Sequence, residues 1–318
     1  MEIRKLAQEI IGGKRLKRGD DLSFFENAGL EELCRGADEI RKALCGEKID
    51  LCSIINGRSG RCSEDCRFCA QSAHYHTGVV EYDLLDTEQI LADCKKHAEK
   101  GVHRYSVVTA GRGLKGKDLE KVCGAYKRMK EECKISLCAS HGLLSEEAFL
   151  ALKESGVSMY HANIETSKRN FPNVCTTHSY EDKISAIRHA QQAGLDVCSG
   201  GIIGMGETFE DRLDMAVSLA ELGVKSIPVN ALMPIPGTAY ENLPQLTEDE
   251  ILRTIAMFRF LSPEAKIRLA AGRSLMTDSG RKAFRAGANA AITGDLLTTC
   301  GNSIEEDKEM LIQMGFLI

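Results

Sequence analysis

Eight short apolar runs recur between residues 49 and 293, and longer segments with apolar residues at helical spacing separate them. Several of these longer segments begin at Ser or Thr and end at Gly, as helices prefer. Strands that alternate with helices of about 10–15 residues predict parallel βαβ units. Eight such units over about 250 residues predict a TIM-type (β/α)8 barrel of the α/β class. The apolar runs are 49–55, 103–110, 134–140, 157–165, 195–203, 224–232, 265–271 and 288–293.

The chain extends beyond this repeating pattern at both ends. Residues 1–46 interleave charged and apolar residues at helical spacing, which predicts an N-terminal helical extension. We expect the barrel itself over 47–295 and a short C-terminal extension over 296–318. Because no linker, low-complexity tract or internal repeat interrupts the sequence, we expect a single domain over 1–318.

Charge and cysteine content bear on the partners and location of the chain. The formal net charge of -5 at pH 7 argues against nucleic acid or an anionic membrane as the main partner. No run of about 18 apolar residues occurs, so no membrane span is expected. The 13 cysteines are an odd number, and no stretch reads as an export signal. These features indicate a reducing cytoplasm, where clustered cysteines serve metal or redox chemistry.

Three cysteines form a cluster directly after the first predicted strand. Cys62, Cys66 and Cys69 have the spacing CxxxCxxC, and in a TIM-type barrel this position is the C-terminal end of a strand, where active sites lie. Thiolates bind iron strongly, and one short loop can wrap one cluster. Three thiolates on a [4Fe–4S] cluster leave one iron open, which can chelate the amino and carboxylate groups of a cofactor.

A zinc site is the alternative interpretation of the same loop. His74 and His76 follow the triplet, so a Cys3His site is conceivable. Structural zinc sites, however, are usually closed four-ligand staples of small domains, and this loop lies at a barrel mouth. We therefore favour the iron–sulfur cluster.

The cysteine spacing together with Phe68, the aromatic residue before the last cysteine, resembles the signature of the radical SAM superfamily. Six further segments, in register over essentially the whole chain, resemble the biotin synthase family. The resemblance implies that S-adenosylmethionine is cleaved to a 5′-deoxyadenosyl radical, which abstracts hydrogen from dethiobiotin. It also implies that a second cluster inside the barrel donates the sulfur that closes the ring of biotin. The segments are SEDCRFCAQSAHYHTG, YHANIETS, VCSGGIIGMGET, PVNALMPIPGTAYEN, IRLAAGR and AGANAAITGDLLTT.

The resemblance also implies a set of residues that bind the cofactor. Phe68 matches the aromatic residue that borders the adenine, and Glu165 matches an acidic residue that binds the ribose hydroxyls. Lys183 stands where the family has an Arg near the cofactor carboxylate, so the charge is kept and the bidentate fork is lost. The segment with Gly200, Gly201 and Glu207 matches the glycine-rich strand along which the methionyl part runs.

Two amides match the residues that hold the ureido ring of dethiobiotin. Asn163 and Asn230 each offer a donor and an acceptor, which suits a cyclic urea. Without the resemblance, both would be read as polar caps at strand ends. His161 stands where another Asn is expected, so this substrate contact departs from the pattern.

The interior cluster of the family is held by three Cys and one Arg, and this sequence matches three of the four. Cys138, Cys198 and Arg268 correspond, whereas Ser106 replaces the remaining Cys. A serine alkoxide is a poor substitute for a thiolate on iron–sulfur. In addition, Ala290 stands where a hydrogen-bonding Ser is expected.

Because the strands that carry these two changes flank the first strand in a closed barrel, we hypothesise that the interior cluster is shifted toward Cys52. The released space could hold a cluster larger than [2Fe–2S]. Cys175, in a loop, is a weaker candidate ligand. The alternative is that Cys52 is a core residue and that Ser106 binds weakly or only hydrogen-bonds.

Other functions remain open at this point. A different radical SAM enzyme, such as a methylornithine-forming mutase or a hydrogenase-maturation enzyme, would use the same barrel. A zinc-stabilised binding protein or an iron–sulfur scaffold would not cleave S-adenosylmethionine. As partners, the family resemblance implies dethiobiotin, a small flavodoxin- or ferredoxin-like electron donor and a second copy in a homodimer.

Overall fold

The computed structural model describes residues 2–297 and 301–318, and its centre is a closed parallel barrel. The strand order is β5-β4-β3-β2-β1-β9-β8-β7-β6, and a further pairing of β5 with β7 closes the sheet. Because β5 and β6 are two halves of one barrel strand, the nine segments form a barrel of eight strands. The predicted TIM-type barrel is confirmed. The strands are Asp50–Arg58 (β1), Arg104–Thr109 (β2), Ser136–Ser140 (β3), Met159–His161 (β4), Asp196–Cys198 (β5), Gly201–Ile203 (β6), Ser226–Ala231 (β7), Lys266–Leu269 (β8) and Ala290–Ile292 (β9).

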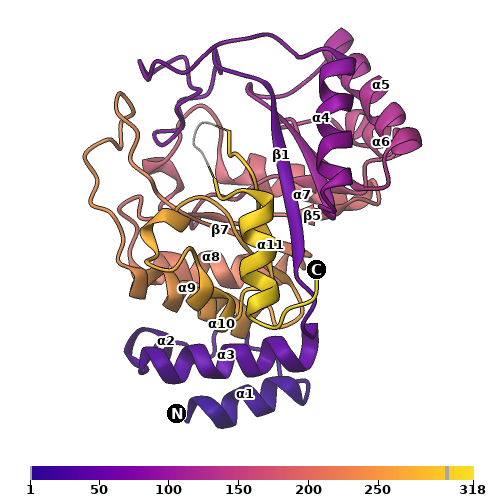
Figure 1. The fold of residues 1–318 in the computed structure, drawn as a ribbon. Coiled ribbons are helices and arrows are strands. Elements are labelled where there is room, and N and C mark those ends of the chain that lie inside the picture. Colours follow the sequence, from indigo (N-terminus) through magenta and orange to yellow (C-terminus); the bar gives the residue numbers. More distant parts are fainter. Residues whose placement is uncertain (1, 298–300) are drawn as a thin grey trace.

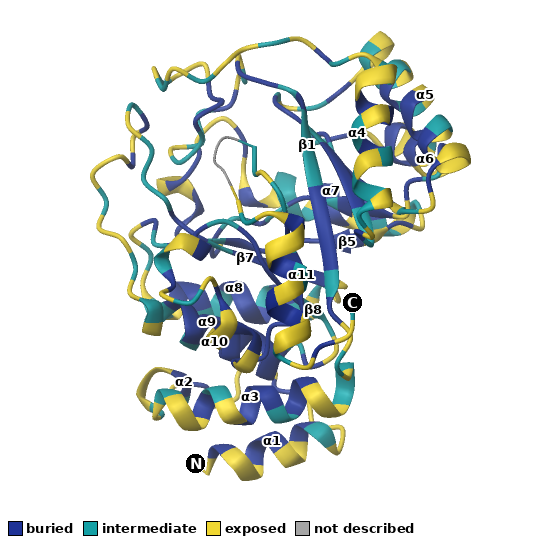
Figure 2. Cartoon of the chain, viewed as in Figure 1, coloured by how far each residue is buried: buried dark blue, intermediate teal, exposed yellow. Residues whose placement is uncertain are grey.

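Helices between the strands cover the outside of the barrel, with buried faces inward and exposed faces outward (Figure 2). Capping boxes at Asp86, Ser179, Thr208 and Thr247 begin four of them, so side chains satisfy backbone donors at these ends. The helices are Thr87–Glu99 (α4), Gly116–Glu132 (α5), Glu146–Glu154 (α6), Tyr180–Gln192 (α7), Phe209–Glu221 (α8), Glu248–Leu261 (α9) and Arg281–Arg285 (α10), with 3-10 turns at Phe171–Asn173 (η1) and Arg273–Leu275 (η2). No helix in the described ranges is long and apolar enough to cross a membrane.

The N-terminal helices Ile3–Ile11 (α1), Phe24–Asn27 (α2) and Leu30–Cys45 (α3) lie at one end of the barrel, where β1 begins (Figure 1). Helix α3 packs against α9, and α1 packs against α3. The C-terminal helix Ile304–Gln313 (α11) is followed by Leu317, whose backbone pairs with Glu47 and Ile49. The loop after β1 crosses the opposite end of the barrel, so the cysteine cluster lies at the mouth.

The fifth barrel strand breaks at Ser199 and Gly200, where the sequence predicts one continuous strand. Here the chain changes partners: β5 pairs with β4, and β6 pairs with β7. A Cβ on Gly200 would lie 1.9 Å from the carbonyl oxygen of Pro228, and a Cβ on Gly201 would lie 2.4 Å from that of Glu165. The two glycines therefore permit a close backbone approach that no side chain allows.

We expect Gly200→Ala to lower the free energy of unfolding by about 3 kcal/mol or more, because backbone atoms must move to admit the methyl group. Gly124→Ala is the matched control, since Gly124 lies exposed in α5 and a Cβ there meets nothing within 4 Å. The control should raise stability by about 0.5–1 kcal/mol through helix propensity. Urea unfolding of cluster-free protein, followed by circular dichroism, measures both, and equal effects would contradict the steric argument.

Candidate functional site

One cavity of about 330 Å³ joins the barrel mouth to the barrel interior. The cysteine loop contributes Phe68 and Cys69 to its rim, and inward-facing residues of the strands form its wall and floor. Side chains far apart in the sequence therefore face one enclosed space. The sequence-predicted residues that line it are Cys52, Phe68, Cys69, Ser106, Cys138, His161, Asn163, Glu165, Cys198, Asn230 and Arg268.

The cysteine loop is held in shape by its own backbone. The amide of Cys62 donates to the carbonyl of Gln71 (3.0 Å), and the amide of Ala73 donates back to Cys62 (2.8 Å). The amide of Cys69 donates to Cys66 (3.0 Å), and Arg67 donates to Val174 (2.9 Å). Burial raises the pKa of the Cys69 thiol to about 11. A metal bound in this loop would have to stabilise the thiolate form of Cys69.

The spacing of the three thiols fits a cluster better than a single ion. Within residues 2–297 and 301–318, the one group of three Cys, His, Asp or Glu ligand atoms that all lie within 4.8 Å of one another is Cys66, Cys175 and His178. Cys62, Cys66 and Cys69 are therefore spread more widely than the thiolates of one zinc ion, which are about 3.8 Å apart for a tetrahedral Zn–S bond of 2.3 Å. A cubane holds its thiolates on separate irons.

The neighbouring histidines do not complete a zinc site in this structure. The Nε2 atom of His74 hydrogen-bonds the carbonyl oxygen of Ser63 at 3.1 Å, and both His74 and His76 are exposed. A structural zinc site needs four ligands that converge. The geometry thus disfavours the Cys3His alternative.

Glu165 and Lys183, both expected near the cofactor, lie beside each other. The ammonium of Lys183 in α7 lies 3.6 Å from Oε1 of Glu165. The other carboxylate oxygen of Glu165, Oε2, is buried and has no hydrogen-bond partner, and its backbone adopts a left-handed φ of 68°. A buried oxygen without a donor is costly, so this site fits a ligand that brings a hydroxyl.

The glycine-rich segment lines the cavity through Ile202, and its acidic residue shapes the following loop. Glu207 is 1% exposed at its side chain and pairs with Arg212 at 2.7 Å. Its carboxylate also accepts hydrogen bonds from the amides of Gly204 (2.8 Å) and Met205 (2.7 Å). Gly200, Gly201 and Glu207 are not among the residues that line the cavity. Glu207 therefore holds the loop after β6 in shape.

Asn163 and Asn230 are oriented by backbone atoms across the strand break. The Oδ1 atom of Asn163 accepts from the amide of Gly200 at 3.0 Å. Asn230 donates from Nδ2 to the carbonyl of Gly201 (3.0 Å) and accepts at Oδ1 from Ala271 (3.2 Å). Both amides thus act as strand-end caps and also line the cavity. The Nδ2 group of Asn163 makes no hydrogen bond to the described residues and can donate to a ligand carbonyl.

Burial in the cavity wall lowers the pKa of His161 to about 4, from an ordinary value of 6.5. The ring is therefore neutral near pH 7. Between the two values only the unfolded chain binds this proton, so stability is complete above pH 6.5 and is lost as the pH falls toward 4.

From pH 7 to pH 5 we expect His161 to account for about 2 kcal/mol of lost unfolding free energy. His161→Asn should lose about 2 kcal/mol less than the unmodified chain over this interval, in urea unfolding of cluster-free protein. If the two proteins lost equal unfolding free energy, the lowered pKa of His161 would be contradicted.

The floor of the cavity carries a second group of thiols. Cys138 and Cys198 pack with Met159 in a small buried cluster, and Cys52 lines the same cavity from β1. Burial raises the pKa of Cys52 to about 11 and that of Cys138 to about 12. Arg268, 2% exposed, forms an ion pair with Asp50.

Ser106 also lines this floor, and its Cα pairs with that of Cys138 in the parallel sheet. Ala290 is buried beside Arg268 in β9 but is not among the lining residues. Cys175 lies outside the cavity lining as well, next to the cysteine loop. Of the two additional cysteines considered for the interior group, the structure therefore brings only Cys52 to it.

Sequence reasoning missed Arg104 at this floor. Arg104 lines the cavity and pairs in register with Cys52, and its Nε is buried without a hydrogen-bond partner. The signal that could have found it is the strand alternation, which places Arg104, Ser106 and Val108 on one inward face. An Arg at the start of a strand is normally interpreted as a surface residue.

The sequence matches two protein families in succession. Residues 58–219 match the radical SAM superfamily, and residues 228–317 match the Biotin and Thiamin Synthesis associated domain. The biotin synthase of Alkaliphilus metalliredigens (strain QYMF) is 75% identical over 316 residues, covering 99% of each chain. The biotin synthase of Clostridium beijerinckii is 62% identical over 316 residues, covering 99% of this chain and 100% of the relative.

Solved structures share the fold at much lower identity. Methylornithine synthase superposes with a TM-score of 0.86 at 21% identity, covering 98% of this chain and 96% of the other. The FeFe-hydrogenase maturase of Carboxydothermus hydrogenoformans superposes with a TM-score of 0.82 at 18% identity, covering 99% of this chain and 79% of the other. At these identities the likeness shows the barrel and not the reaction.

Proposed function

The chain belongs to the biotin synthase family of radical SAM enzymes, and we propose that two groups of thiols facing one cavity hold the iron–sulfur clusters for its reaction, the insertion of sulfur into dethiobiotin to form biotin. The observation that carries the proposal is this shared space. Cys69 at the mouth and Cys52, Cys138 and Cys198 at the floor line the same 330 Å³ cavity. The cavity would therefore hold the cofactor, the substrate and the interior cluster in one enclosed space.

The cofactors would supply the difficult chemistry. A [4Fe–4S] cluster with S-adenosylmethionine would yield the 5′-deoxyadenosyl radical, and an interior iron–sulfur cluster would supply the sulfur. Cys62, Cys66 and Cys69 hold the first cluster, and Phe68 borders the adenine. The buried Oε2 of Glu165 accepts from the ribose hydroxyls, while Lys183 orients Glu165 and faces the cofactor carboxylate. No side chain of the chain needs to act as general acid or base.

The interior cluster is held by Cys52, Cys138, Cys198 and Arg268, with Ser106 beside them. Three thiols and a guanidinium line the cavity floor. Burial raises the pKa of the Cys52 and Cys138 thiols, so a bound cluster would supply the positive charge that stabilises their thiolates. Arg104 supports this assignment, because its unpartnered Nε can donate to a cluster sulfide.

Dethiobiotin lies between the two groups of thiols. Asn163 and Asn230 reach the cavity in orientations set by Gly200 and Gly201, and an amide N–H suits the carbonyl oxygen of a cyclic urea. His161, neutral near pH 7, lines the same wall and can donate or accept there. The main demand on these residues is to hold the target carbons within reach of the radical.

We further propose two protein partners, an electron donor and a second copy of the chain. The reaction requires one electron for each cleavage of S-adenosylmethionine, which a small flavodoxin- or ferredoxin-like protein supplies. The family resemblance further implies a homodimer.

Anaerobic reconstitution with iron and sulfide, followed by reduction in the presence of S-adenosylmethionine and dethiobiotin, tests the function. Mass spectrometry should detect biotin and about two 5′-deoxyadenosines per biotin, as the family's two-cofactor stoichiometry requires. Formation of 5′-deoxyadenosine without biotin would favour a different radical SAM reaction. Protein that binds zinc in place of iron, or never releases 5′-deoxyadenosine, would overturn the proposal.

A further inference from the structure

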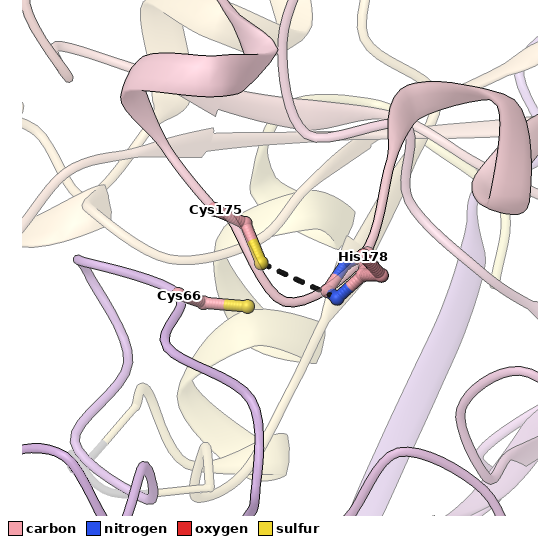
Figure 3. A group of neighbouring side chains, drawn as sticks. All are labelled: Cys66, Cys175 and His178. Atoms are coloured by element: carbon pink, nitrogen blue, oxygen red, sulfur yellow. Dashed lines mark hydrogen bonds between the residues drawn. The ribbon is translucent and has the colours of Figure 1, made fainter.

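A second group of metal-ligating side chains lies beside the cysteine loop, outside the main cavity. Cys66 comes from that loop, Cys175 follows η1, and His178 precedes α7 (Figure 3). One ligand atom from each lies within 4.8 Å of the others. The Sγ of Cys175 is 3.3 Å from Nδ1 of His178. Two segments, the cysteine loop and the loop between η1 and α7, thus bring two sulfurs and a nitrogen to one point.

This spacing suits a single ion. Ligands of a tetrahedral zinc ion with Zn–S near 2.3 Å and Zn–N near 2.0–2.1 Å lie about 3.5–3.8 Å apart. The Cys175–His178 separation of 3.3 Å is close to that edge. Neither Cys62 nor Cys69 has its sulfur within 4.8 Å of all three of these ligand atoms, so the two arrangements around Cys66 differ in scale.

Two carboxylates surround the group. Oε2 of Glu64 lies 2.7 Å from Nδ1 of His178, and Oδ1 of Asp65 lies 3.1 Å from Sγ of Cys175. The side chains of His178 and Glu64 are 4% and 9% exposed, and Nε2 of His178 is buried without a partner. Buried imidazole, thiols and carboxylates in contact are the donor set of a borderline-soft divalent cation, with a carboxylate available as fourth ligand.

We propose that the cluster-free chain binds one thiophilic divalent cation, Fe²⁺ in the working protein, through Cys66, Cys175 and His178. Binding releases two protons to solvent, one from the Cys66 thiol and one from the Cys175–His178 pair, and involves no change of oxidation state. Because Cys66 is also a ligand of the proposed cubane, the ion leaves this site as that cluster forms. The site is thus a holding position for the first iron, which deepens and rests on the assignment of Cys66 to the cluster.

Cobalt titration of the full chain, stripped of metal by a chelator and kept anaerobic, tests the site. Co²⁺ is the probe because tetrahedral thiolate ligation gives it charge-transfer and d–d absorption. We expect one Co²⁺ per chain in the unmodified protein and in a Cys62→Ala/Cys69→Ala double variant. Cys175→Ala should weaken Co²⁺ binding by at least about tenfold, and Cys175→Ser should also weaken it, because a hydroxyl is a harder ligand.

Cys123→Ala is the matched control, since it removes a half-buried thiol from α5 and should leave the titration unchanged. Circular dichroism confirms that each variant is folded. Absence of Co²⁺ binding overturns the proposal, as does binding that depends on Cys62 and Cys69 but not on Cys175. The [4Fe–4S] spectrum and 5′-deoxyadenosine release of the reconstituted unmodified protein test the cluster assignment separately, so either can fail alone.

Discussion

Cys69→Ala abolishes the formation of 5′-deoxyadenosine, with or without dethiobiotin, and this is the largest effect we expect from any single substitution. Cys69 lines the cavity together with Phe68 and Glu165. With two thiolates left, the loop cannot hold a cubane that keeps one iron open for the cofactor. The protein itself has no group that can cleave the sulfonium, so no slower route remains.

The measurement is 5′-deoxyadenosine by mass spectrometry after anaerobic reconstitution and reduction. Cys123→Ala is the control, because it removes a thiol that lines no part of the cavity and should keep full activity. Retention of a tenth or more of the 5′-deoxyadenosine in Cys69→Ala would remove this residue from the ligand set.

Cys52→Ala separates the two halves of the reaction. If Cys52 completes the interior ligand set with Cys138, Cys198 and Arg268, its loss should remove the interior cluster and abolish biotin formation. The mouth cluster uses other ligands, so 5′-deoxyadenosine should still form. Iron should fall to about four atoms per chain, the content of a single cubane.

Ser106→Ala is the matched control for this prediction. Ser106 lines the same floor and stands where the family has a Cys, but an alkoxide is a poor iron–sulfur ligand. We therefore expect nearly unchanged iron and sulfide in this variant. Analysis of iron and sulfide, with Mössbauer spectroscopy, decides the matter. Unchanged interior iron in Cys52→Ala, or its loss in Ser106→Ala, would return the ligand role to strand β2.

The barrel could be predicted because its signal is local and repeated. Each apolar run of six to nine residues is long enough for one buried strand, and amphipathic helices follow most of them. The break between β5 and β6 could not be predicted in this way. It arises because Gly200 meets the carbonyl oxygen of Pro228, a contact between segments that only the closed sheet brings together.

The same contrast between local and long-range features applies to the site. The motif of Cys62, Cys66 and Cys69 spans eight residues, so it could be recognised in the sequence. Arg104 was missed because an isolated Arg carries no motif, and its inward direction follows from its pairing with Cys52. The sequence also did not show that Glu207, predicted at the cofactor, holds its own loop through the amides of Gly204 and Met205.

By itself, the sequence determined the order of strands and helices, the cysteine loop at a strand end and the likeness to a family, because each of these depends on residues that are neighbours in the chain. The tertiary structure decided which distant side chains share a space. It placed Cys52 with Cys138 and Cys198, and it placed Cys175 with Cys66 and His178 instead. The physical reason is that barrel closure and strand register set the distances between residues that lie far apart in the chain.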